Sequence, residues 1–219
     1  MTKHQKYTII NWSVAFLIYL LFSVWHGALE GPLTPQEIDH YASEYQKIYP
    51  DRDTQRLRAL MASDNGKPLY MVNAIKLYDT PQLINGKKAG NSSSEILDTY
   101  TKHVFSFLLK HGSYPLYSGN TTFDAVERWG LDDVDEWSSG AVVRYRSMRT
   151  MMKMSTDPSF AQFHDYKIAA MEKTIAFPTT SVLTLGGLSI IFPLLLIIIC
   201  LLIQLRINFK KYNSINPVQ

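Results

Sequence analysis

The sequence predicts an α+β domain that is anchored by two transmembrane helices, one toward each end of the chain. Two long apolar stretches without charge support this fold class, as does the order of strands and helices between them. The chain has 219 residues, which is enough for one domain of about 150 residues with additional elements. The mean hydropathy is −0.08, so the membrane character lies in the two stretches and not in the average composition.

The first apolar stretch, residues 7–28, is predicted to be a transmembrane helix that follows a short cytoplasmic tail, residues 1–6. It carries no Asp, Glu, Lys or Arg, and about 20 apolar residues in a helix rise about 30 Å, which spans the hydrocarbon of a bilayer. The alternative is a signal peptide cleaved after Ala28, because the tail is basic. His26 stands where such a cleavage site needs a small residue, so an uncleaved anchor is favoured.

The second apolar stretch is predicted to span the membrane over residues 180–205, followed by a basic cytoplasmic tail, residues 206–219. It exceeds the length of about 18 apolar residues that indicates a transmembrane helix. This boundary leaves about two residues between the last predicted strand and the span, which would hold the domain close to the membrane. The single cysteine, Cys200, lies inside the span. We interpret it as a lipid-facing or packing residue, and it cannot form an intramolecular disulfide.

The distribution of charge predicts the topology. All 19 acidic residues and 17 of the 22 Lys and Arg lie within residues 30–175. The domain is therefore slightly acidic and the tails are basic. Because basic residues that flank a span are retained in the cytoplasm, the sequence predicts a two-pass protein of the inner (cytoplasmic) membrane with both termini cytoplasmic and the domain extracytoplasmic. The basic tails favour the lipid bilayer as partner and no nucleic acid.

A two-helix extension, residues 29–66, is predicted to precede the main domain. Thr34 and Glu37 have the spacing of a capping box, with proline in the first turn, and predict a helix over residues 34–48. Its apolar positions recur at helical spacing and form an aromatic face: Ile38, Tyr41, Tyr45 and Ile48. This face either packs on the domain or meets the membrane surface or a membrane-protein partner.

A shorter helix is expected next, between Asp53 as its N-cap and Gly66 as its stop. Leu57, Leu60 and Met61 form its apolar stripe. Its arginines, Arg52, Arg56 and Arg58, are interpreted as a solvated face.

The domain itself is predicted over residues 67–178. β-forming residues that alternate with polar ones indicate strands, and Ser or Asp before apolar periodicity indicates helix starts. The expected elements are a strand at 69–78, a loop at 79–93, a helix at 94–111, strands at 113–122 and 139–146, a Met-rich helix from Ser147, a helix opened by Asp157-Pro158, and a last strand at 173–178.

The order β-α-β-β-α-β is that of the ferredoxin-like arrangement. Such a four-stranded antiparallel sheet carries helices on one face only. A second copy of the domain is the simplest cover for the other face, so we expect a homodimer through the sheet.

Motifs that identify a reaction are absent from the sequence. It has no Gly-rich phosphate loop, no H-E-x-x-H or paired-cysteine signature and no G-x-S-x-G elbow. Asp132, Asp133 and Asp135 resemble a calcium loop only superficially, because the glycine and the terminal glutamate of that loop are missing. We therefore predict neither a metal site nor a cofactor.

A pocket is expected between the first strand, the third strand and the helix at 94–111, since a concave site with a few convergent polar groups is the usual form of a ligand site. The candidate residues for binding a ligand are Asn73, Lys76, Tyr100, Tyr117 and Tyr145. The candidate residues for catalysis are His103 and Arg144.

Several stretches resemble the domain-of-unknown-function 1330 family of the dimeric α+β barrel superfamily, over about residues 57–179. They are PLYMVNAIKLY, KHGSYPLYSG, WSSGAVVRYRSMRTMMKMSTDPSF and EKTIAFPT. The most specific pieces are the strand with Met71, Asn73 and Lys76, the pair Arg144-Tyr145 with Ser147, and the segment from Met154 to Phe160. The resemblance implies a ferredoxin-like subunit that pairs sheet to sheet with a second copy.

The chain departs from the family pattern at two positions and in its additional elements. Arg146 stands where proline is usual, and Met148 stands where arginine is expected, with Arg149 one step later. The helix at 34–48 and the two spans lie outside the family domain.

Three functions remain open from the sequence. The first is a membrane-anchored ligand-binding or accessory module, such as a small subunit of a membrane complex, which the two anchors and the missing catalytic motifs favour. The alternative is a cofactor-free oxygenase or isomerase on a small hydrophobic substrate, which the superfamily resemblance implies, with His103 as base and Arg144 holding an anionic oxygen. A haem-binding role through His103 or His164 is implied in the same way. The sequence does not decide whether the protein is an enzyme.

Overall fold

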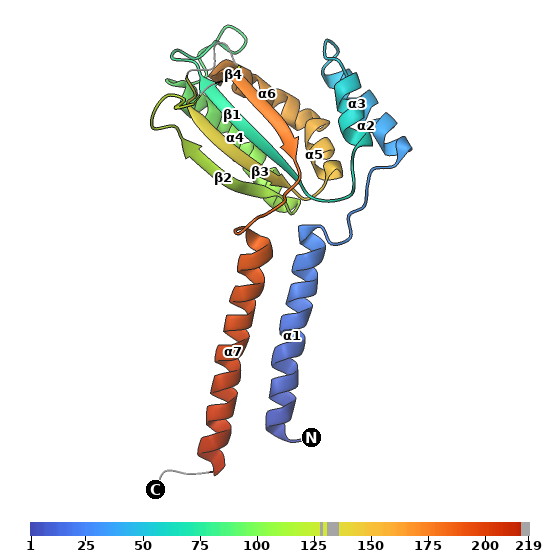
Figure 1. Ribbon diagram of the computed structural model, residues 1–219, viewed down its shortest axis with the longest axis vertical. Coiled ribbons are helices and arrows are strands. Elements are labelled where there is room, and N and C mark those ends of the chain that lie inside the picture. Colours follow the sequence, from blue (N-terminus) through green and yellow to red (C-terminus); the bar gives the residue numbers. More distant parts are fainter. Residues whose placement is uncertain (128, 131–135, 216–219) are drawn as a thin grey trace. The chain divides into compact units, whose positions relative to one another are not determined.

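The computed structural model describes residues 1–127, 129–130 and 136–215. The chain forms two compact units: unit 1, residues 1–28 and 183–219, and unit 2, residues 29–182. Unit 2 contains a four-stranded antiparallel sheet with helices, and two long apolar helices stand at the ends of the chain, so the α+β class is confirmed (Figure 1). The elements are α1 Lys3–His26, α2 Pro35–Ile48, α3 Gln55–Ala62, β1 Leu69–Leu77, α4 Ser93–Lys110, β2 Tyr114–Asn120, β3 Ser139–Tyr145, α5 Met148–Ser155, α6 Pro158–Ala170, β4 Met171–Thr179 and α7 Leu188–Ile215.

Unit 1 consists of α1 and α7, whose length and apolar composition are sufficient to cross a membrane. The two helices contact each other. The rings of Phe22 and Phe192 stack with their centres 4.1 Å apart, and the amide of Asn11 donates a hydrogen bond of 3.0 Å to the carbonyl of Cys200. Cys200 is only 3% exposed, so it is a packing residue between the helices.

The start of α7 differs from the sequence prediction. The helix begins at Leu188, whereas the predicted span begins at residue 180. Residues 180–187 are not helical. Gly187 has a non-helical φ of 100°, and its carbonyl accepts the first hydrogen bond of the helix from the N–H of Ile191, so the helix cannot extend further toward β4. The expected two-residue connection between strand and span is therefore wrong, and a longer segment joins β4 to α7.

The sheet of unit 2 has the strand order β2-β3-β1-β4, with every neighbouring pair antiparallel. Helices α4 and α6 lie on one face of it (Figure 1). Met71 pairs with Val143 on β3 and with Pro178 on β4, and both Met71 and Val143 pack against the buried core. The alternate residues of each strand therefore point toward the helices.

The opposite face of the sheet is open within the described part of unit 2. Val72 pairs with Val142 and Phe177, one position away from the residues that face the core. Phe177 is 48% exposed and Tyr117, which also pairs with Val142, is 60% exposed. We refer to this apolar surface as the open sheet face.

The extension packs into the core of the domain. The predicted capping box of α2 is confirmed, since Thr34 Oγ1 accepts from the N–H of Glu37 and the Glu37 carboxylate accepts from the N–H of Thr34. Tyr41 is 7% exposed and lies in one cluster with Met151 and Met152 of α5. The aromatic face therefore packs against the domain. A membrane-protein partner at helix 34–48 stays a prediction, and such a partner would have to bind the outer face of α2.

The starts of three other helices can be compared with the predicted ones. Ser147 caps α5 and Asp157 caps α6, as predicted. The predicted cap of α3 is wrong by one residue: Thr54 is the N-cap, and the Asp53 carboxylate instead accepts from the N–H of Gln55 at 2.7 Å.

Candidate functional site

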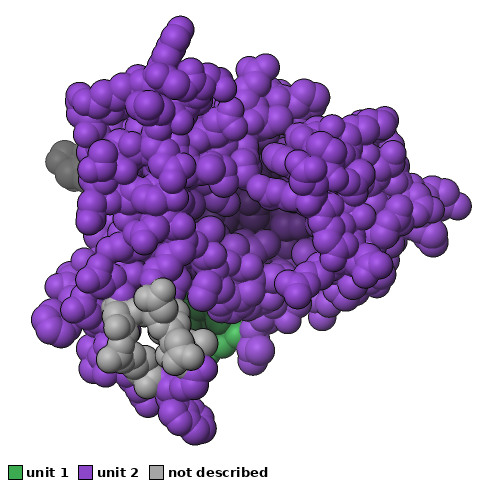
Figure 2. Space-filling model, turned by 90° about the horizontal axis from the view of Figure 1, so that it is seen from above, with its two compact units in different colours: residues 1–28, 183–219 green, residues 29–182 purple. Residues whose placement is uncertain are grey.

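Unit 2 contains a cavity of about 510 Å³ between the helix-covered face of the sheet and α4. Residues at the end of α2, in the segment before α3 and on α5 and α6 complete its wall. The surface of unit 2 is visibly hollowed on the face drawn in Figure 2. The volume lies within the range of about 300–1,000 Å³ that is typical of small-molecule sites. We refer to this space as the sheet–helix cavity.

Most of the cavity wall is apolar. Met71 and Ile75 of β1 point into it because they share the face of the sheet that the helices cover. Leu97 and Val104 contribute from α4, and Phe160 contributes from α6. The wall therefore suits a hydrophobic body.

Three basic side chains gather at one part of this wall: Arg52, His164 and Lys167. We refer to them as the cationic end. Arg52 is exposed, and its guanidinium lies 4.7 Å from the centre of the Tyr49 ring. The same guanidinium reaches His164 Nε2 at 3.5 Å, while His164 and Lys167 are half-buried one helical turn apart on α6. The extension and the domain thus both contribute to the cationic end.

The environment of the cationic end disfavours further positive charge. Burial lowers the pKa of His164 to about 4, and the charges of Lys167 and Arg52 act in the same direction. Burial also lowers the pKa of Lys167, again with a contribution from Arg52. His164 is therefore neutral at pH 7, and its ring offers a hydrogen bond and not a charge.

Two phenols and one amide add polar groups to the cavity. Burial raises the pKa of Tyr100 to about 12 and raises the pKa of Tyr145 as well. Both hydroxyls therefore stay protonated at neutral pH and are suited to donate hydrogen bonds, not to act as bases. The Asn73 amide nitrogen donates to the carbonyl of Met71 at 3.0 Å, which leaves its oxygen as an acceptor.

The structure brings together three of the seven residues expected in the pocket. Asn73, Tyr100 and Tyr145 line the sheet–helix cavity. The other four do not line it: Lys76, His103, Tyr117 and Arg144. The strand residues do not line the cavity because successive side chains of a strand point to opposite faces of the sheet. Tyr145 faces the helices, so its neighbour Arg144 faces the other side.

Arg144 and Lys76 have partners of their own. Arg144 is 3% exposed and donates a hydrogen bond of 3.0 Å to the carbonyl of Gly112. Its guanidinium lies 5.4 Å from the centre of the Tyr114 ring, and burial lowers its pKa. Lys76 forms an ion pair of 2.5 Å with Glu136. Both side chains stabilise the sheet and its connections.

His103 lies between α4 and α6. Its ring stacks on Phe163 with the centres 3.9 Å apart and contacts Phe160 at 4.6 Å. Its Nε2 is buried without a hydrogen-bond partner among the described residues. This position does not support a role for His103 as a base toward a ligand in the sheet–helix cavity.

No sequence pattern indicated Arg52 or Lys167 as site residues, and His164 was expected only as a haem ligand. Arg52 looks like part of a solvated helix face, but α3 begins at Gln55, so Arg52 belongs to the preceding turn. His164 and Lys167 have the i, i+3 spacing of neighbours on one helix face, which is the one signal that the sequence offered. The acidic residues Asp132, Asp133 and Asp135 lie outside the described residues.

The fold and the cavity define the class of this protein: an α+β domain with a cavity of small-molecule size, joined to two apolar helices. No family model matches the chain, and no curated protein sequence matches it.

Two solved structures are similar in fold. One is the crystal structure of the RPA0582 protein of unknown function from Rhodopseudomonas palustris, with a TM-score of 0.52 and 16% identity over 61% of this chain and 97% of that chain. The other is the methylated RPA0582 protein, with a TM-score of 0.52 and 18% identity over 63% of this chain and 96% of that chain. These similarities concern the fold alone.

Proposed function

We propose that this protein is a membrane-anchored ligand-binding module whose unit 2 holds a small molecule in the sheet–helix cavity. The observation that carries the proposal is the cavity itself, about 510 Å³ in volume, with an apolar wall and a few polar groups that converge on it. Such a combination is the usual form of a small-molecule site. As a binding module it acts as an accessory subunit of a membrane complex.

The test is the retention of a ligand by the full-length protein taken from its native membrane into lipid nanodiscs. Ala141 lines the cavity, and Ala141→Phe fills the space beside it. We expect mass spectrometry of the extracted small molecules to show one compound at near-stoichiometric amount in the wild type and little of it in Ala141→Phe. The matched control is Ala59→Phe, at an exposed position of α3. Equal retention in all three proteins, or none in any, contradicts a binding function for the cavity.

The proposed architecture is a ferredoxin-like domain of the domain-of-unknown-function 1330 family. The strand order β2-β3-β1-β4, with both long helices on one face, supports it. Two copies pair through the open sheet face, where Ile175 and Phe177 are 45% and 48% exposed. Covering such apolar side chains is the usual reason for sheet-to-sheet pairing. The domain is extracytoplasmic, between two spans of the inner membrane.

One crosslinking experiment tests both the pairing and the topology. We expect Phe177→Cys to give a crosslinked dimer when a membrane-impermeant bismaleimide is added outside intact spheroplasts. Ile168→Cys is the control, because Ile168 is 50% exposed but lies on α6, away from the sheet. It is expected to react with an impermeant maleimide without forming a dimer. Labelling of Ile168→Cys without a Phe177→Cys dimer contradicts the pairing, and no labelling of either contradicts the topology.

A further inference from the structure

Lys167 is a cation that has no counter-charge among the described residues. Its side chain is half-buried on α6 and lines the sheet–helix cavity. It takes part in no ion pair or hydrogen bond with any residue that the structure describes. A buried ammonium group is costly unless it is paired. Within the described part of the chain, the positive charge of Lys167 at the cavity wall is therefore unpaired.

The neighbouring charges do not supply the missing partner. Arg52 is the charged group that acts on Lys167, and it is also positive. Two carboxylates lie nearby: Asp165 acts on His164 and Tyr49, and Asp98 lines the cavity from α4. Both are exposed, and neither forms an ion pair with Lys167. Because no carboxylate of the described residues pairs with Lys167, the cationic end is complementary to a negatively charged group of a ligand.

The rest of the cavity wall indicates the chemistry of the uncharged part of the ligand. The larger part of this wall is apolar and includes side chains such as Met71, Val104 and Phe160, while serine, threonine and asparagine side chains contribute polar atoms. The hydroxyls of Tyr100 and Tyr145 face the same space and make no hydrogen bond with the described residues. They are suited to donate to an oxygen of the ligand. A purely ionic ligand such as free phosphate would leave this apolar space unfilled.

We infer that the sheet–helix cavity takes a small carboxylic acid with an apolar body, whose carboxylate lies against Lys167 and Arg52. This inference rests on the proposed binding function, because it names the ligand class of the same cavity. Arg52 belongs to the extension and Lys167 to the domain. The extension therefore contributes to ligand selection, and docking of the extension completes the site.

The test compares acids with neutral amides of the same shape. The probes are 2-naphthoate with 2-naphthamide, and octanoate with octanamide, so that a flat and an elongated apolar body are both represented. Binding to the full-length protein in nanodiscs is measured by calorimetry, with empty nanodiscs subtracted. We expect at least one acid to bind about tenfold or more tightly than its amide, because a charge-assisted hydrogen bond to a buried cation favours the acid.

Two variants assign this preference to the cationic end. Lys167→Met keeps most of the side-chain volume, and we expect it to bind the acid and the amide within about twofold of each other while it retains the wild-type affinity for the amide. Arg58→Met is the matched control, because Arg58 pairs with Asp39 on the surface and does not line the cavity. It is expected to keep the full preference of the wild type.

The outcomes separate the ligand class from the binding function. If the wild type binds an acid and its amide equally well, the carboxylate inference is wrong and the binding function stands. If it binds none of the four probes at millimolar concentration, the cavity is not a site for small apolar molecules and both proposals fail. A preference that persists unchanged in Lys167→Met also contradicts the inference.

Proton uptake gives a second readout. Burial lowers the pKa of Lys167 in the free protein, and a bound carboxylate favours the charged ammonium and raises that pKa again. At a pH between the lowered pKa of Lys167 and the ordinary pKa of lysine, calorimetry in two buffers of different ionisation enthalpy is therefore expected to show proton uptake on binding of the acid. The uptake should be absent with the amide and in Lys167→Met. Uptake of the same size in Lys167→Met contradicts the assignment to this lysine.

Discussion

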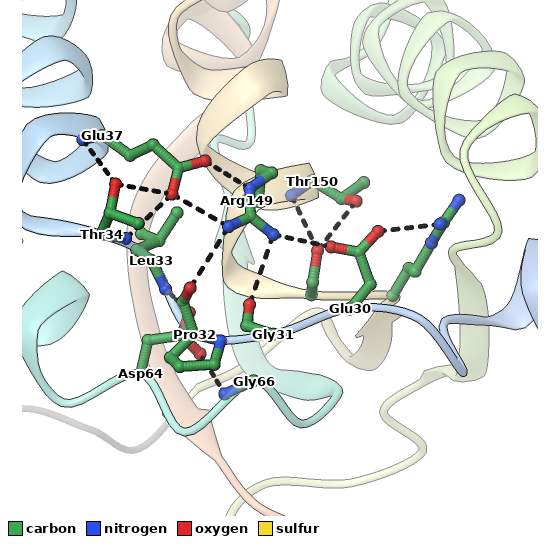
Figure 3. Close-up of polar contacts among 12 residues, drawn as sticks. Glu30, Gly31, Pro32, Leu33, Thr34, Glu37, Asp64, Gly66, Arg149 and Thr150 are labelled. Atoms are coloured by element: carbon green, nitrogen blue, oxygen red, sulfur yellow. Dashed lines mark hydrogen bonds and ion pairs between the residues drawn. The ribbon is translucent and has the colours of Figure 1, made fainter.

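Replacing Arg149 by methionine is expected to lower the free energy of unfolding of unit 2 by about 2–4 kcal/mol. The guanidinium of Arg149 lies between two carboxylates (Figure 3). Its Nε and Nη2 donate to the Glu37 carboxylate at 2.6 and 3.0 Å, and its Nη1 donates to Glu30 at 2.9 Å. It also donates to the carbonyls of Gly31 and Pro32, each at 3.3 Å. One side chain therefore attaches the start of the extension to α5.

The loss is large because the partners are shielded from water. The side chains of Arg149 and Glu30 are only 23% and 13% exposed, and the arginine binds the Glu37 carboxylate with two parallel hydrogen bonds, which is the strongest geometry for such a pair. Without Arg149, the two carboxylates lose the charge that compensates them. Glu30 keeps Arg146 at 2.8 Å, so the network is weakened and not abolished.

The pH dependence of the free energy of unfolding provides an independent test of the Arg149 network. The hydrogen bond from Arg149 lowers the pKa of Glu37 from 4.5 to about 2. Because this pKa is lower in the folded state, the stabilisation is complete above about pH 4.5 and is lost as the pH falls toward 2. In Arg149→Met the stability should therefore change less with pH across this window.

Urea denaturation of the full chain in nanodiscs, followed by circular dichroism, measures the loss. The control is Arg58→Met, which removes an ion pair of 2.5 Å whose side chains are 44% and 73% exposed. Exposed pairs of this kind are worth about 0–1 kcal/mol. If the two substitutions lower the free energy of unfolding equally, the Arg149 network is no stronger than an ordinary surface ion pair.

Replacing Gly66 by alanine is expected to destabilise unit 2 by about 2–4 kcal/mol. Gly66 has a φ of +75°, and an added Cβ would lie 2.8 Å from the backbone nitrogen of Pro32 and 2.9 Å from the carbonyl carbon of Gly31. Backbone atoms cannot move aside as a flexible side chain can. The turn is also tied to this segment by Asp64, which accepts from the N–H of Leu33 at 2.9 Å.

Gly86→Ala is the matched control for this effect. Gly86 has almost the same φ, +74°, but no atom lies within 4 Å of the position of an added Cβ. It therefore reports the cost of the left-handed conformation alone, about 1 kcal/mol. We expect the same denaturation measurement to show a loss for Gly66→Ala that exceeds this value by at least about 1 kcal/mol. Equal losses in the two variants would show that the extension tolerates a shift at Gly31 and Pro32.

Much of the local structure follows from short-range rules that the sequence makes visible. Thr34, Ser147 and Asp157 cap their helices as predicted, because a side-chain oxygen three residues or fewer from an unpaired N–H is a local interaction. The strands were also located, since alternation of apolar and polar residues is local. The boundary of α7 was missed because apolar composition dominated over the conformational preference of Gly186 and Gly187.

The candidate site was predicted less well, for two different reasons. Arg144 and Tyr145 are adjacent in a strand, so the alternation already excludes that both line one cavity, and the same holds for Asn73 and Lys76. The cationic end could not be predicted for a different reason, which is that it depends on tertiary packing. Arg52 and Lys167 come from distant segments that line one cavity only when the extension packs on the domain, and no local sequence pattern indicates that packing.

Glu37 takes part both in the start of α2 and in the attachment of α2 to α5. Its Oε2 accepts from the N–H of Thr34 and so caps the start of α2, and its Oε1 and Oε2 both accept from Arg149 of α5. The nucleation of the helix and its attachment therefore depend on one group. The extension also places Tyr41 and Met61 in the buried core, so we expect it to stay attached in the folded protein and to keep Arg52 at the cavity wall. A carboxylate that does not line the cavity thus helps to hold the cationic end together.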